Sequence, residues 1–158
     1  MKMEMGSYQN NTNIQITELN GLHRRVLNHA NAHRKCRGIN NRMHSLINVL
    51  MLIFSAAVTS LEALLDITKN EYEVQIVKIS FAGIVTFLAS LNSLYNNGEK
   101  AALHDYCNKS YTQLAYEIEA QIHSHNDSEY SEYLNKFAKI KSDSIGIFGF
   151  VRKIYKIE

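Results

Sequence analysis

The 158-residue chain is 46% hydrophobic and 20% charged, contains no Pro or Trp, and has a net charge of +2. This length suits one domain, and the lack of Pro, which breaks helix interiors, permits long unbroken helices. Two Cys residues, Cys36 and Cys107, are too few for a disulfide framework.

The N-terminal residues 1–17 are polar and rich in Asn. They lack the pattern of a secretory signal peptide, and we predict a flexible tail. A helix is expected from about Thr17, because a set of side chains then recurs at spacings of three and four, which mark one helical face. These are Leu22, Val26, His29, His33 and Cys36.

A basic block without any Asp or Glu lies between Leu19 and Leu61. Its charged residues are Arg24, Arg25, Arg34, Lys35, Arg37 and Arg42. Such a block suggests an anionic partner, either nucleic acid or a cytoplasmic membrane leaflet. Because an uncharged apolar segment follows, a lipid bilayer is the preferred partner and no nucleic acid is expected.

Two uncharged stretches are long enough to cross a membrane. Ser45–Leu61 is extended past Glu62 to Leu65, and Ile79–Gly98 is the second. A spanning helix needs about 20 mostly apolar residues, so we predict spans at 45–65 and 78–97. A soluble bundle that buries both helices on all sides is the alternative.

The charges that flank the spans predict their orientation. The connecting segment contains Lys69 and Lys78 against Asp66, Glu71 and Glu73, whereas the basic block precedes the first span. The positive-inside rule therefore places both termini in the cytoplasm. The predicted fold class is all-α: an antiparallel transmembrane helical hairpin over residues 18–126, with long cytoplasmic helix extensions.

The C-terminal residues 127–158 are predicted to form amphipathic helices. One helical face carries Tyr130, Tyr133, Leu134, Phe137 and Ile140. The last segment, 145–158, combines apolar residues with Arg152, Lys153 and Lys156, a combination that suits a helix lying on an anionic membrane surface. We expect an attachment device outside the hairpin's own core; packing against the hairpin is the alternative.

An antiparallel register in which facing residue numbers sum to about 140 explains several polar residues. It places Glu62 opposite Lys78 and Asn48 opposite Asn92, as interhelical polar contacts. It also places Lys35 opposite Asp105, His33 opposite Cys107, and Cys36 opposite His104.

Chemistry-bearing motifs are sparse. His33, Cys36, His104 and Cys107 could supply the ligands of a tetrahedral zinc site, but ordinary interfacial side chains are preferred, so no metal and no cofactor is predicted. The sequence has no Gly-rich phosphate loop, GxSxG or HExxH motif. We therefore predict no catalytic residues and no enzymatic activity.

The layout resembles a known family. A basic helix (HRRVLNHANAHRKCRGINNRMH), two spans around a short acidic loop, and a helix with Tyr106, Leu114, Tyr116 and Glu117 are similar to the SLATT family of two-span effector domains, over roughly Leu19–Ile122. That resemblance implies oligomerisation and membrane disturbance by pore formation.

A second, weaker resemblance rests on the Asn-rich, Pro-free composition, which is similar to that of small two-span membrane proteins of large DNA viruses. It implies a minor capsid component in an internal virion membrane. Taken together, we predict a non-enzymatic, oligomeric membrane scaffold, whose partners are the bilayer, further copies, or other membrane or capsid proteins. A SLATT-like pore is the alternative.

Overall fold

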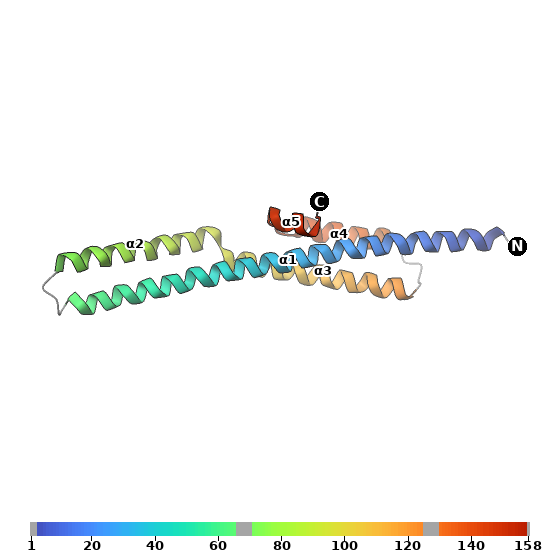
Figure 1. The fold of residues 1–158 in the computed structure, drawn as a ribbon. Helices are drawn as coiled ribbons and strands as arrows, with labels where there is room; N and C mark the ends of the chain where they lie inside the picture. Colours follow the sequence, from blue (N-terminus) through green and yellow to red (C-terminus); the bar gives the residue numbers. More distant parts are fainter. Residues whose placement is uncertain (1–2, 66–70, 125–129, 158) are drawn as a thin grey trace. The chain divides into compact units, whose positions relative to one another are not determined.

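The computed structural model describes residues 3–65, 71–124 and 130–157, with side chains for 16–63, 72–124 and 130–157. Every element is an α helix (Figure 1): α1 Met3–Leu65, α2 Glu71–Tyr95, α3 Asn97–Ser124, α4 Tyr130–Asp143 and α5 Gly149–Tyr155. The described residues contain no strand, so the predicted all-α class is confirmed. Helix α1 begins at Met3, upstream of the expected start near Thr17.

The contacts divide the chain into two units. Residues 1–37 and 101–158 form the first, which we call the bundle unit, and residues 38–100 form the second, the hairpin unit. Helices α1 and α3 each contribute residues to both units.

The core of the bundle unit forms between α1, α3 and α4. Leu22 and Val26 of α1, Tyr111 and Ile118 of α3 are fully buried, and Phe137 of α4 packs against the same cluster. The apolar face predicted for α1 is confirmed, because its 3–4 spacing places these side chains along one stripe of the helix.

Helix α3 contributes the facing side of this core. Cys107, Tyr111, Leu114 and Ile118 are buried, whereas Leu103 is 44% exposed. The hydroxyl of Tyr111 accepts a hydrogen bond from Ser144 within the core, 3.2 Å away. A buried Tyr needs such a polar partner, and the partner lies on a distant part of the chain.

The hairpin unit pairs the C-terminal part of α1 with α2 in antiparallel orientation. The rings of Phe54 and Phe81 meet at a centroid distance of 5.5 Å, and Lys78 reaches Glu62 with 2.6 Å between Nζ and Oε1. Both pairs join positions on either side of one turn, as an antiparallel hairpin requires.

The helical path is broken at Asn96, although i to i−4 hydrogen bonds continue on both sides of it. Asn96 has φ 44° and separates α2 from α3. Asn occupies this left-handed region more readily than other non-Gly residues. The flanking bonds, from Asn96 N–H to the Asn92 carbonyl and from Lys100 N–H to the Asn96 carbonyl, are both 3.0 Å.

The C-terminal segment packs into the bundle unit, contrary to the expectation that 145–158 lies outside the core. Val151 of α5 is fully buried, and Ile145 packs against the core cluster. Other side chains of the segment remain exposed, among them Phe150 and Ile154. The apolar side chains of the segment therefore lie on two faces. One face is buried in the bundle unit, and the other is exposed.

Candidate functional site

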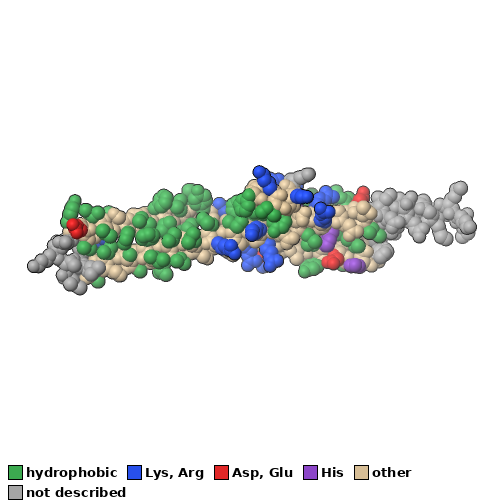
Figure 2. All heavy atoms as spheres, viewed as in Figure 1, with side chains coloured by type: hydrophobic (Ala, Val, Ile, Leu, Met, Phe, Trp, Pro, Cys, Tyr) green, Lys and Arg blue, Asp and Glu red, His purple; other side chains and the backbone are tan. Residues whose placement is uncertain are grey.

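The hairpin unit carries an extensive apolar surface. Leu52 is 71% exposed, Phe87 62% and Leu94 77%. Two helical segments, within 16–63 and 72–124, are long and apolar enough to cross a membrane, and only 6% and 0% of their most hydrophobic windows are buried. Figure 2 shows hydrophobic side chains gathered over the hairpin helices. The visible surface of the hairpin unit is therefore largely apolar (Figure 2).

Hydroxyl groups within this surface are bonded to their own helices. Thr59 donates to the Ser55 carbonyl at 3.1 Å and Thr86 to the Ala82 carbonyl at 3.0 Å. The same i to i−4 pattern occurs at Ser60, Ser80 and Ser90. Polar groups satisfied within one helix do not require water, so these side chains are compatible with an apolar surrounding.

The interhelical polar contacts follow the predicted register at one end of the hairpin and depart from it at the other. Lys78 and Glu62 form the expected ion pair. Asn48 and Asn92 meet through a third residue: Asn48 Nδ2 donates to His44 Nε2 at 3.1 Å, and His44 Nδ1 donates to Asn92 Oδ1 at 3.2 Å. The facing pair is thus His44 and Asn92, because the register shifts by about one helical turn along the hairpin.

The predicted membrane-surface cations are all solvent-exposed. In α1 these are Arg24, Arg25, Arg34, Lys35, Arg37 and Arg42, and in the C-terminal segment Arg152, Lys153 and Lys156. Their exposure leaves them accessible to an anionic surface.

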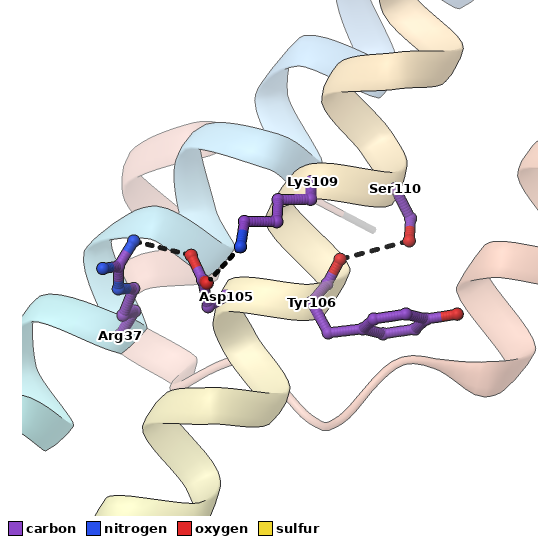
Figure 3. Close-up of polar contacts among 5 residues, drawn as sticks. All are labelled: Arg37, Asp105, Tyr106, Lys109 and Ser110. Atoms are coloured by element: carbon purple, nitrogen blue, oxygen red, sulfur yellow. Dashed lines mark hydrogen bonds and ion pairs between the residues drawn. The ribbon is translucent and has the colours of Figure 1, made fainter.

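One of these cations is engaged in a small charge cluster of the bundle unit (Figure 3). Arg37 contacts Asp105 Oδ1 at 2.6 Å, and Lys109 contacts Asp105 Oδ2 at 2.9 Å; nearby, Ser110 donates to the Tyr106 carbonyl. The predicted partner of Asp105, Lys35, is therefore wrong. The Lys109 hydrogen bond, with the Arg37 charge, lowers the pKa of the Asp105 carboxyl.

A buried histidine cluster lies between α1 and α3. His33 Nδ1 and His104 Nδ1 are 2.9 Å apart, and the His33 ring stacks on Tyr111 at a centroid distance of 5.5 Å. Two imidazoles share such a bond only if one Nδ1 carries a proton and the other does not. The predicted register paired His33 with Cys107 and Cys36 with His104; the hydrogen bond instead joins His33 to His104.

Burial keeps this cluster neutral. Desolvation lowers the pKa of His33 to about 4, with additional repulsion from His104 and His29. Burial likewise lowers the pKa of His29 to about 4, and the charges of Lys141 and Arg152 act in the same direction. The pKa of His104 is lowered by burial as well.

The cluster does not assemble a metal site. Within the described ranges, no group of three or more His, Cys, Asp or Glu residues is placed to hold a metal ion. His33, Cys36, His104 and Cys107, named above as possible zinc ligands, are thus not brought together as such a group. Burial instead raises the pKa of the Cys36 thiol, opposed by a hydrogen bond with the Phe148 backbone, so this sulfur is a packed side chain.

Sequence reasoning missed several members of the cluster: Tyr111, Ser144 and Phe148. His29 was placed on the correct helical face, but its aromatic contacts with Tyr111 and Phe137, at centroid distances of 5.1 and 5.3 Å, join three helices and leave no signal in the local sequence. No family model, curated protein or solved structure matches this chain.

Proposed function

We propose that the chain is a non-enzymatic integral membrane protein that acts as an oligomeric scaffold. In this proposal residues 45–65 and 78–97 cross the bilayer and both termini are cytoplasmic. The observation that carries the proposal is the apolar surface of the hairpin unit, which includes Leu52, Phe87 and Leu94.

The exposure of these side chains argues against the soluble alternative. Removing one such side chain from water contributes about 1.5–3 kcal/mol, and a soluble bundle would gain that free energy by burying them. Here the most hydrophobic windows are 6% and 0% buried. Contiguous apolar surface of this kind marks a site for membrane or protein contact, and the length of both helices favours the bilayer.

The distribution of charge supports the proposed orientation. Arg34, Lys35, Arg37 and Arg42 precede the first span and are exposed. Cytoplasmic leaflets are anionic and attract juxtamembrane cations by about 1 kcal/mol each. The proposed scaffold is thus held by its spans and fixed in orientation by its basic flank.

Self-association is the proposed basis of the scaffold. Exposed small residues of α2, such as Ala82, Gly83 and Ala89, allow another helix to approach closely. On the basis of the composition, we propose that the scaffold lies in a virion membrane, where capsid proteins are its neighbours. The hydroxyls of Thr59 and Thr86 bond to their own helices, which favours a scaffold over a water-lined pore.

Insertion is tested by placing a charge on the apolar surface. Phe87→Lys should shift the protein from the membrane pellet to the supernatant on alkaline carbonate extraction, because a charge at a span centre costs about 2.5–3.5 kcal/mol. Tyr116→Lys in the bundle unit is the matched control, since Tyr116 is 67% and Phe87 62% exposed. Extraction of the wild-type chain as a soluble monomer would refute membrane insertion.

The scaffold and pore versions are separated by induced expression in cells. The scaffold predicts accumulation without leakage of a small dye, cross-linking into oligomers, and co-purification with shell proteins in a viral setting. Rapid leakage that is lost on Asn48→Leu would instead identify a pore and overturn the scaffold.

A further inference from the structure

A groove in the bundle unit runs between α1, α4 and the C-terminal segment. It consists of two hollows of about 260 and 220 Å³ that share His29, Lys141 and Ile157 in their walls. Arg25 and Lys156 line the first hollow, and Arg152 lines the second. Residues from three parts of the sequence thus converge on one concave surface.

The described walls of this groove are strongly cationic. Arg25, Lys141, Arg152 and Lys156 line it, and none of the lining residues is Asp or Glu. Arg25 donates from Nη2 to the hydroxyl of Tyr130 at 3.4 Å, a neutral partner that leaves its charge uncompensated by that bond. Arg25, Arg152 and Lys156 converge from two parts of the chain, and like charges repel, so the arrangement favours an anion between these three cations.

Neutral hydrogen-bonding groups accompany the cations. Asn28 lines the first hollow, and His33 lines the second. His33 is fully buried, and its Nε2 has no hydrogen-bond partner among the described residues. The Lys141 and Arg152 charges also depress the pKa of His29, after the larger effect of burial.

We propose that this groove binds a phosphate-bearing anion of small size, such as a phosphomonoester. A guanidinium binds phosphate oxygens through two parallel hydrogen bonds, and an ammonium adds a compact charge. Ligand pockets typically have about 300–1,000 Å³, so each hollow, at about 220–260 Å³, suits a phosphate group with a short substituent better than a whole nucleotide. The ligand is either a free metabolite or the headgroup of an anionic lipid.

The test uses the purified full chain in neutral detergent micelles, titrated with glycerol 3-phosphate at constant ionic strength in a calorimeter. The variant Arg152→Gln/Lys156→Gln removes two groove cations, and Lys153→Gln is the matched control, because Lys153 is exposed in the same C-terminal segment but does not line the groove. We expect at least tenfold weaker binding for the double variant and unchanged binding for the control. Lys141→Gln, on α4, provides a second variant with the same expected loss.

A second titration, with short-chain lipids, identifies the source of the phosphate. Dioctanoyl phosphatidic acid is compared with dioctanoyl phosphatidylcholine. Variant-sensitive binding of phosphatidic acid without binding of glycerol 3-phosphate supports a lipid headgroup; binding of both supports a free phosphomonoester.

Any of the following results would overturn the proposal: no binding of either phosphate probe, equal losses for the double variant and Lys153→Gln, or equal binding of phosphatidylcholine. Equal near-ultraviolet circular dichroism of all variants verifies that they are folded. Tighter, variant-sensitive binding of a short RNA would also overturn it in favour of a nucleic-acid site.

Discussion

Acidification from pH 7 to pH 5 should destabilise the bundle unit through its buried histidines. His29 is 7% exposed and His33 fully buried, and burial lowers the pKa of each to about 4. An unfolded His titrates near 6.5. Between these values the unfolded chain binds protons that the folded chain does not, so stability is present above pH 6.5 and is lost as the pH falls toward 4.

The magnitude follows from the two pKa values. At pH 5 each of these histidines costs about 2 kcal/mol relative to pH 7, or about 4 kcal/mol for the pair, when a pKa of about 4 is set against 6.5. The groups that surround them act in the same direction or remain uncharged: Lys141 and Arg152 repel a proton on His29, and Tyr111 is neutral. His104, whose pKa is also lowered, adds to the effect.

The assay is urea unfolding of the full chain in neutral micelles, followed by the near-ultraviolet circular dichroism of tyrosine, because the chain has nine Tyr and no Trp. In the His29→Gln/His33→Gln variant, the free energy of unfolding should differ much less between pH 7 and pH 5 than in the wild-type chain, whatever the variant's absolute stability. His23→Gln, on the same helix, is the control. An unchanged pH dependence in the double variant would refute the assignment of the buried imidazoles.

Three further experiments test the core and the hairpin ion pair. Tyr111→Phe removes the hydroxyl that accepts from Ser144 and should cost about 1 kcal/mol in urea unfolding; no change would show that the bond contributes nothing. Val151→Ala should lower the free energy of unfolding by about 2 kcal/mol because Val151 is fully buried. An unchanged free energy of unfolding would show that the C-terminal segment is not part of the core. Glu62→Lys should weaken the hairpin, and adding Lys78→Glu should restore it by up to about 1 kcal/mol, since the pair is partly exposed; a double variant no better than the single one would contradict the pairing.

The helical class and the apolar face of α1 could be predicted from sequence because both follow from local periodicity. Leu22, Val26 and His33 recur at helical spacing, and the structure buries all three. The ion pair of Lys78 with Glu62 could also be predicted from the sequence, because a short connection fixes the register close to the turn.

Contacts far from the turn were less predictable. His33 meets His104 in place of Cys107, and Asp105 meets Arg37 in place of Lys35. The two contacts depart from the predicted register in opposite directions, so each depends on local side-chain packing and not on one shift of the helices. The break at Asn96 depends on a single backbone angle. Burial of Val151 depends on how the C-terminal segment folds back, which no local pattern specifies.

The chemistry of the hairpin unit is unevenly distributed along its length. Lys78 with Glu62 lies near the turn and His44 with Asn92 near the other end, while Thr59 and Thr86 bond within their own helices. Between the ends, rings such as Phe54 and Phe81 need only shape and hydrophobicity, which several residue types provide. Homologous chains should therefore diverge freely along the middle of both helices while retaining the polar residues at the two ends. Relatives of this protein are better sought by the spacing of these two polar pairs than by overall sequence identity.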